Sequence, residues 1–254
     1  MFVQIVNRLR AAGCVFAEEE AELLLAEADT PQRLEAMVAR REGGVPLEQI
    51  LGWAEFCGLR IMVEPGVFVP RRRTGFLVQQ AARLLAPGDL VVDLCCGSGA
   101  VGVALLERVP GLDLYACDVD PAAVRCATGN VGDRGQVRLG DLYAALPDTL
   151  RGHVQVLAVN APYVPSDAIR LMPPEARDYE PRVALDGGPD GVDVQRRVAA
   201  EAPEWLRPGG ALLIETGADQ ASATTAASTR AGLTTTVLTS EELDATLVIG
   251  RRTT

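Results

Sequence analysis

The stretch VVDLCCGSGAVG, Val91 to Gly102, has the pattern of a buried strand that turns sharply into a helix. Its apolar start leads into Gly97, Gly99 and Gly102, which form a Gly-x-Gly-x-x-Gly spacing. Glycine permits a tight turn and lets a ligand approach backbone N–H groups at a helix N-terminus. The stretch predicts a nucleotide-type ligand site at a strand end, although the same pattern also suits a plain strand–helix turn.

After Pro87, short apolar runs alternate with helix-like stretches, which is typical of a parallel sheet with helices on both faces. The last two apolar runs are joined by a link too short for a helical crossover, so that pair should be antiparallel. We expect an α/β fold with a doubly wound, seven-stranded, mostly parallel sheet and one reversed strand at the end. The strand-like runs are 89–96, 112–120, 136–143, 154–163, 210–217, 233–238 and 245–252.

The first part of the chain has the pattern of helices followed by a hairpin. Glu18–Ala28 is amphipathic, and Thr30-Pro31 supplies a capping residue and a first-turn proline for a second helix that ends at Gly43-Gly44. Apolar residues alternate on both sides of Gly58, which predicts a β-hairpin. The expected organisation is a helical N-terminal domain at 1–50, a β-hairpin and linker at 51–75, and the main domain at 76–254.

The composition is that of an ordinary globular chain with an acidic surface. The 254 residues are 48% hydrophobic and 23% charged, and the formal net charge is −10. Such a surface repels phosphate backbones, so we expect no direct nucleic-acid partner. The one basic run, Arg71 to Arg73, is too short to form a binding patch alone; it is more often a solvated face, but its place after GVFVP leaves a ligand role open.

Cysteine usage and hydropathy predict a protein that resides in a reducing cytoplasm and has no metal site. The six cysteines form no Cys-x-x-Cys pair and no zinc-like spacing with His153. Met1 to Arg10 contains no sustained apolar segment, and no run is long enough to span a membrane. We therefore expect a cytoplasmic protein with no membrane partner.

Three acidic residues stand at or just after the ends of predicted strands. Asp93 lies just before the glycine turn, where a carboxylate disfavours a pyrophosphate but suits the ammonium group of an amino acid, as in S-adenosylmethionine (SAM). Asp118 is placed to accept both hydroxyls of a ribose, whereas Asp120 before Pro121 suits a helix cap. Asp141 could accept an adenine amino group, with Leu142 lining the ring.

The stretch AVNAPYVP, Ala158 to Pro165, ends a fourth strand in polar and aromatic groups. Ligands of open α/β sheets bind at the carboxyl ends of the strands, so Asn160 should lie beside the glycine loop. The alternative is that Asn160 caps a turn and Tyr163 packs in the core. The following connection, Val164 to Gly191, is long and rich in Pro, Asp and Arg, which is typical of a lid over a site.

Taken together, these segments resemble a known family. DLCCGSGAVGVAL, ACDVDPAAV, GDLY and NAPY are similar to motifs I to IV of class I SAM-dependent methyltransferases. GVFVPRRRTGFLV, NAPYVP and EPRVALDGGPDGVDVQRRV further resemble the HemK/PrmC family of protein N5-glutamine methyltransferases, from about Gly44 to Arg252. The resemblance implies a Rossmann-like fold, SAM as cofactor and an N-terminal domain that docks the substrate. The cofactor-binding residues that it implies are Phe68, Pro70, Asp93, Cys95, Gly97, Ser98, Gly99, Asp118, Val119, Asp141, Leu142 and Asn160.

The same resemblance implies the catalytic residues. The family's Asn-Pro-Pro-Tyr tetrad falls on Asn160, Ala161, Pro162 and Tyr163. The Asn160 side-chain oxygen and the Ala161 carbonyl would accept the two N–H bonds of a glutamine amide, and Tyr163 would stack on its plane. The chain departs from the family at Ala161, which replaces a proline, and at Arg72 to Gly75, where two carboxylates are missing.

The implied reaction is SAM-dependent methylation of an amide nitrogen, with a protein glutamine of the release-factor type as the acceptor. A small-molecule N-methyltransferase remains an alternative, because the altered Arg72–Gly75 loop could reshape the pocket. A non-catalytic SAM-binding regulatory protein is a second alternative, although Asn160 and Tyr163 would serve an acceptor rather than the cofactor. The net charge argues against a DNA adenine methyltransferase, and Asp93 argues against an NAD-dependent dehydrogenase.

Overall fold

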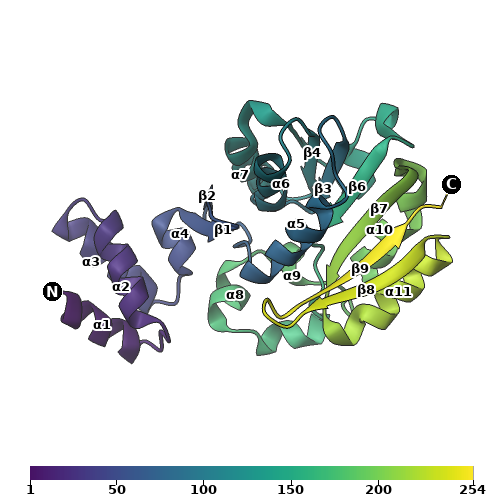
Figure 1. The fold of residues 1–254 in the computed structure, drawn as a ribbon. Helices are drawn as coiled ribbons and strands as arrows, with labels where there is room; N and C mark the ends of the chain where they lie inside the picture. Colours follow the sequence, from purple (N-terminus) through teal and green to yellow (C-terminus); the bar gives the residue numbers. More distant parts are fainter. Residues whose placement is uncertain (254) are drawn as a thin grey trace.

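The computed structural model describes residues 1–253, which form a small helical lobe and a larger α/β domain (Figure 1). The second and third helices of the lobe confirm the two predicted from the sequence. The Thr30 hydroxyl accepts a hydrogen bond from the Arg33 N–H at 3.2 Å, and Gly44 follows the helix with a φ of +86°. The lobe packs around its own apolar core, which includes Leu9, Leu24 and Val38. Its helices are α1 (Phe2–Ala11), α2 (Ala17–Glu27), α3 (Pro31–Glu42) and α4 (Leu47–Leu51).

The predicted hairpin connects the lobe to the larger domain. Strands β1 (Trp53–Phe56) and β2 (Leu59–Met62) are antiparallel, and the turn between them has positive φ angles at Cys57 and Gly58. The side-chain amide of Asn130, in α7 (Pro121–Val131), bonds to both the N–H and the C=O of Met62, each at 2.9 Å. These two bonds attach the hairpin to the α/β domain.

The larger domain contains the predicted seven-stranded, mostly parallel sheet, with strand order β5-β4-β3-β6-β7-β9-β8. Strand β9 is antiparallel to both of its neighbours, β7 and β8. The reversed strand is thus the last in the chain, as expected, but it lies inside the sheet rather than at its edge. The strands are β3 (Leu90–Leu94), β4 (Asp113–Asp118), β5 (Gln136–Leu139), β6 (Val154–Val159), β7 (Leu206–Thr216), β8 (Thr234–Ser240) and β9 (Ala245–Arg251).

Helices cover both faces of the sheet, which explains why strand β6 is apolar except at Gln155. Val156 and Ala158 belong to the core under α5 (Gly75–Ala82) and α6 (Ala100–Arg108). Leu157 and Val159 point to the opposite face and join the core under α10 (Asp193–Trp205) and α11 (Ala221–Arg230). A strand buried on both faces in this way has only its ends available for polar groups.

The long connection after β6 is folded rather than irregular. It contains a 3₁₀ segment and two short helices, and it passes beside the lobe (Figure 1). Its elements are η5 (Ser166–Leu171), α8 (Pro174–Tyr179) and α9 (Arg182–Leu185). The other 3₁₀ segments are η1 (Arg72–Thr74), η2 (Gly132–Arg134), η3 (Leu142–Ala145), η4 (Asp148–Leu150) and η6 (Ala218–Gln220).

Within residues 1–253, no helix combines the length and apolar character needed to cross a bilayer. The same residues contain no cluster of three or more His, Cys, Asp or Glu side chains suited to a metal ion. All six cysteines are free thiols.

Candidate active site

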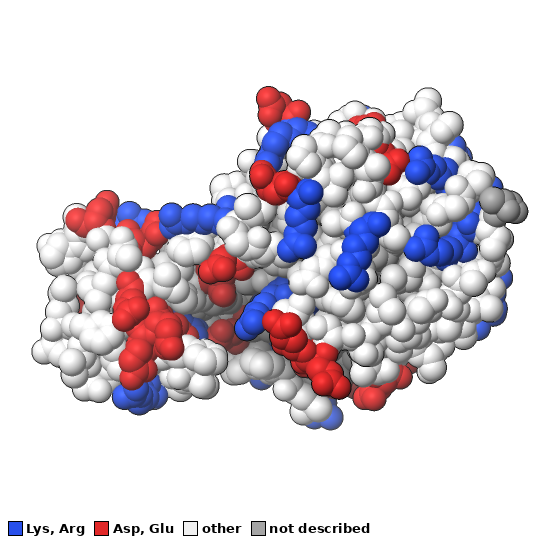
Figure 2. Space-filling view, viewed as in Figure 1, with Lys and Arg blue, Asp and Glu red and all other residues white. Residues whose placement is uncertain are grey.

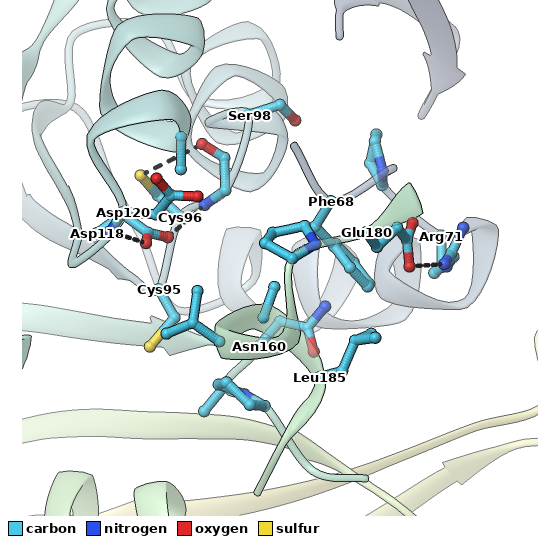
Figure 3. A pocket seen from close by; sticks show the side chains of 18 of the residues that line it. Phe68, Arg71, Cys95, Cys96, Ser98, Asp118, Asp120, Asn160, Glu180 and Leu185 are labelled. Carbon is cyan, nitrogen blue, oxygen red and sulfur yellow. Dashed lines mark hydrogen bonds and ion pairs between the residues drawn. The ribbon is translucent and has the colours of Figure 1, made fainter. Parts of the chain in front are cut away.

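A cavity of about 650 Å³ opens at the carboxyl edge of the sheet, and Pro46 and Glu48 extend its wall to the lobe side. The surface is hollowed where the lobe meets the larger domain, with acidic and basic side chains around the junction (Figure 2). Every residue predicted from the sequence for the cofactor or the acceptor lines this cavity, except Gly99. Those lining residues are Phe68, Pro70, Asp93, Cys95, Gly97, Ser98, Asp118, Val119, Asp141, Leu142, Asn160, Ala161, Pro162 and Tyr163. Figure 3 shows how residues from separate elements converge here.

The glycine loop has the left-handed backbone that its sequence predicts. Gly97 and Gly99 have φ angles of +54° and +76°. A Cβ at Gly97 would meet no other atom within 4 Å, whereas one at Gly99 would lie 3.1 Å from the Ala127 Cβ. Gly97 therefore borders open space in the cavity, and Gly99 allows the loop to pack closely on α7.

The N–H groups of the three glycines differ from the expectation that they face a ligand. Gly97 donates to the Asp118 carboxylate at 2.9 Å, and Gly102 donates to the Asp93 carboxylate at 2.9 Å. Gly99 donates to a neighbouring backbone carbonyl at 2.7 Å. The glycine spacing thus serves to hold the two strand-end aspartates and to shape the loop.

Asp93 is a buried carboxyl group at the floor of the cavity, with 2% of its surface exposed. Burial raises the pKa of Asp93 to about 7; the Gly102 N–H opposes this rise, and the nearby Asp118 charge adds to it. A cation bound beside Asp93 would stabilise its ionised form. The residue therefore has the environment expected of a partner for an ammonium group.

The other acidic residues differ in how much of each side chain is already engaged. Both Asp118 oxygens accept backbone N–H groups, from Gly97 and Asp120, at 2.9 Å. Asp120 caps α7 by accepting the Ala122 N–H at 2.8 Å, as the sequence predicts. Asp141 pairs with Arg197 at 2.7 Å, a partner that the sequence did not indicate. The ribose and adenine roles of Asp118 and Asp141 stay predictions, because carboxylate oxygens can accept more than one hydrogen bond.

The acceptor side of the cavity contains two unused hydrogen-bond acceptors. The Asn160 amide nitrogen donates to the Thr74 hydroxyl at 3.3 Å. No hydrogen bond within residues 1–253 reaches the Asn160 side-chain oxygen or the Ala161 carbonyl. The Tyr163 carbonyl accepts from the Gln220 side chain at 2.8 Å, which fixes the backbone after the tetrad. These residues can therefore receive an N–H-bearing group from the cavity.

Sequence reasoning missed an ion pair on the cavity wall. Glu180, just after α8, has a 1% exposed side chain that pairs with Arg71 at 2.6 Å and accepts the Val69 N–H at 3.1 Å. Burial raises the pKa of Glu180, and the Arg71 guanidinium opposes that rise. Arg71 also lies over the Phe68 ring, 4.7 Å from its centroid (Figure 3). Arg71, the first residue of the basic run, is therefore part of the cavity wall and not of a fully solvated face.

A second missed contact joins the wall to the helical lobe. Arg41 of α3 is buried between Glu20 of α2, at 2.6 Å, and Glu175 of α8, at 2.7 Å. The Tyr179 hydroxyl also donates to the Gly43 carbonyl at 2.7 Å. Nothing in the local sequence pattern links these residues, because more than a hundred positions separate the two segments.

The comparisons with known proteins agree with this geometry. The release factor glutamine methyltransferase of Streptomyces coelicolor is 38% identical over 231 residues, covering 84% of this chain and 82% of that protein. The protein of the same name from Geobacter sulfurreducens is 39% identical over 197 residues, covering 75% and 68%. The chain belongs to the release factor glutamine methyltransferase family. Residues 58–171 of the chain also match the family model of the methyltransferase small domain.

The fold of this family member also matches that of solved methyltransferases. The crystal structure of a methyltransferase from Pyrococcus furiosus aligns with a TM-score of 0.61 and 15% identity. The alignment covers 85% of this chain and all of that one. At 15% identity this match shows a shared fold and nothing about the methyl acceptor.

Proposed function

We propose that this chain transfers a methyl group from SAM to the side-chain amide nitrogen of a glutamine in a protein, with a peptide-chain release factor as the substrate. One observation carries the proposal. The free acceptor pair, the Asn160 side-chain oxygen and the Ala161 carbonyl, opens into the same cavity as the glycine loop and Asp93. The residues that we propose for the cofactor and those that we propose for the amide thus line one cavity.

The residues around the loop fit the chemical groups of SAM. The Asp93 carboxyl suits the ammonium group, and Asp118 offers further acceptor capacity to ribose hydroxyls. Val119 is 49% exposed at the end of β4, and Leu142 is buried beside Asp141, so apolar surface is available to an adenine ring. When bound, SAM supplies a methyl group activated by attachment to a sulfonium. The chain's own residues supply the binding and orientation.

An amide nitrogen is a weak nucleophile because its lone pair is delocalised into the carbonyl group. The Asn160 oxygen and the Ala161 carbonyl can each accept one N–H bond of the amide, which fixes the plane of the nitrogen. Tyr163 lines the cavity beside them and offers an aromatic face to the amide. In this arrangement the rate gain comes from orientation, since no strong base is needed for the transfer itself.

The alanine at position 161 keeps the atom that this scheme requires. Ala161 is 1% exposed, and its carbonyl is the group that would accept the amide N–H. A proline in the same place would supply the same carbonyl while restricting φ. The buried position of Ala161 restricts the backbone by packing, so the departure from the family tetrad is compatible with amide binding.

The deciding experiment uses tritiated SAM with the purified chain and a purified release factor. Label in the release factor, lost when its acceptor glutamine is changed to alanine, supports the proposal. Label that appears only in a small-molecule fraction of cell extract would assign the chain to the alternative N-methyltransferase class. SAM binding without transfer to any fraction would leave only the regulatory alternative.

A further inference from the structure

Glu215 is a buried carboxyl group that the proposed reaction leaves without a role. Its side chain is 1% exposed, near the end of β7. Neither of its oxygens makes a hydrogen bond of good geometry within residues 1–253, although the Thr74 hydroxyl lies nearby. A buried carboxyl without partners costs free energy, so its presence beside a functional site calls for an explanation.

The register of the sheet places Glu215 next to Asn160. Strands β6 and β7 run parallel, and Val159 is paired with Ile214. Asn160, the first residue after β6, and Glu215 of β7 follow this last pair in the two segments. Neighbouring positions of parallel strands project to the same face of the sheet, so the two side chains leave the sheet together.

Thr74 lies close to both residues. It is 3% exposed at the end of η1, and its hydroxyl accepts the Asn160 amide N–H at 3.3 Å. A hydroxyl has one proton, and accepting from Asn160 leaves that proton free to be donated elsewhere. Burial raises the pKa of Glu215 to about 7, and the neighbouring Thr74 hydroxyl and Arg73 guanidinium oppose the rise. The carboxyl is thus within the influence of the Thr74 hydroxyl.

We infer that Glu215 and Thr74 are positioning residues that fix the orientation of the Asn160 amide. This inference rests on the proposed function. In the proposed arrangement the Thr74 hydroxyl turns its proton toward Glu215, so that it can only accept from Asn160. Only the amide nitrogen of Asn160 can face such a group, which turns the Asn160 oxygen toward the cavity. That oxygen is the atom that must meet the N–H of the methyl acceptor.

A carboxylate at position 215 selects between the two orientations of the Asn160 amide. The two orientations of an asparagine amide have nearly the same shape and differ only in where the donor and the acceptor lie. In the reversed orientation, the Asn160 nitrogen would meet the nitrogen of the incoming amide, donor against donor. A hydroxyl alone accepts either orientation, because it can rotate its proton. A hydroxyl whose proton is committed to Glu215 accepts only one.

The first test needs no methyl acceptor. The carboxyl carbon of Glu215 is followed by ¹³C NMR against pH in the wild type, in Thr74→Val and in Thr74→Ser. Loss of the hydroxyl in Thr74→Val should move the titration midpoint upward, and Thr74→Ser should return it toward the wild-type value. The same midpoint in all three proteins would overturn the inference, whatever the substrate.

The second test measures turnover with the release factor. Thr74→Val and Glu215→Gln should each lower kcat about 10- to 100-fold while the dissociation constant of SAM changes less than about twofold. Thr74→Ser should recover most of the lost kcat. Thr225→Val is the matched control, because it removes a buried, unpartnered hydroxyl from α11, outside the active-site cavity.

The outcomes separate the two proposals. If the wild type transfers no methyl group to protein, the proposed function fails, and the NMR titration still decides whether Thr74 donates to Glu215. If the wild type is active and both variants keep wild-type kcat, the positioning role is overturned and the proposed function stands.

Discussion

The Asp93 carboxylate accepts the backbone N–H of Gly102 at 2.9 Å, which joins the end of the first parallel strand to the third glycine of the loop. One contact therefore links the motif that determines the fold to the residue that we expect to bind a cationic group. A Cβ at position 102 would lie 3.3 Å from the same carboxylate oxygen and 2.9 Å from a methyl group of Leu114, so a larger residue there would have to displace that side chain. The loop and the carboxylate form one unit.

Asp93→Asn should weaken SAM binding without disturbing the loop. The asparagine oxygen can still accept the Gly102 N–H, but the negative charge opposite the ammonium group is lost. The expected cost is about 10- to 100-fold in the dissociation constant, the size of a charge-assisted hydrogen bond. Isothermal titration calorimetry measures it, with Asp89→Asn before the same strand as a control for the change in net charge.

Asp93 also predicts a pH dependence of cofactor binding. Its pKa is raised to about 7, so the group is largely protonated below neutral pH and ionised above it. Because the ammonium group favours the ionised form, the association constant for SAM should rise between pH 6 and pH 8, by up to about tenfold per pH unit on the acidic side. The slope should vanish in Asp93→Asn. An equal slope in the variant would assign the proton to another group.

Asn160→Ala should separate binding from catalysis. The change removes the side-chain acceptor that we assign to the substrate amide and leaves Asp93 and the glycine loop intact. We expect kcat to fall about 10²- to 10³-fold, the usual cost of one oriented hydrogen-bond partner, with the SAM dissociation constant within about twofold of wild type. Loss of SAM binding together with turnover would instead make Asn160 a structural residue.

The strands and the residues at their ends could be predicted from the sequence because both signals are local. The apolar run of β6 and the polar residues after it are adjacent in the chain, so Asn160 was predicted at the correct edge of the sheet. Glu215 was missed, although a carboxylate inside the apolar run GALLIETG was a usable signal. The run predicts a strand, but only the sheet order shows that β6, which ends beside Asn160, is the neighbour of β7.

The cavity wall could not be predicted, because its contacts join distant segments. Arg41 and Glu175 are 134 positions apart, and each sits in a polar stretch that looks solvated on its own. The place of β9 between β7 and β8 was also beyond reach. An antiparallel pair at the end of the chain can add to a sheet in either order, and only packing decides which.

The Arg41 contacts predict that two substitutions differ in their effect on stability. Arg41→Ala leaves Glu20 buried without its partner, so the free energy of unfolding should fall by about 3 kcal/mol. Glu175→Gln weakens only the half-exposed pair with α8, and it should cost less than about 1 kcal/mol. Urea unfolding measures both values. Equal losses in the two variants would contradict the assignment of Glu20 as the buried partner.

The ion pair between Arg41 and Glu175 predicts a local effect on the cavity wall. Glu175→Gln should speed amide hydrogen exchange in residues 172–180, because α8 loses a link to α3, while exchange in the strands stays unchanged. Mass spectrometry resolves the two regions. Faster exchange throughout the chain would indicate global destabilisation instead of release of the wall.

Glu215→Gln should make the protein more stable at alkaline pH while making it slower. Burial raises the pKa of Glu215 to about 7 from an ordinary value of 4.5, so the folded state binds this proton more tightly than the unfolded chain. Folding stability from this group is therefore greatest below about pH 4.5, decreases as the pH rises to 7 and is constant above that value.

Glutamine has no proton to lose, so the difference in unfolding free energy between the variant and the wild type should grow in favour of the variant from pH 5 to pH 8. The shift in pKa corresponds to roughly 3 kcal/mol as an upper value. Urea unfolding at the two pH values measures this difference, and other titrating groups cancel in the comparison. If the difference in unfolding free energy does not change with pH, the pKa of Glu215 in the folded protein is the ordinary one. A gain in stability with a loss of kcat is the combination expected when a buried charge is kept for orientation, and a purely structural residue would not produce it.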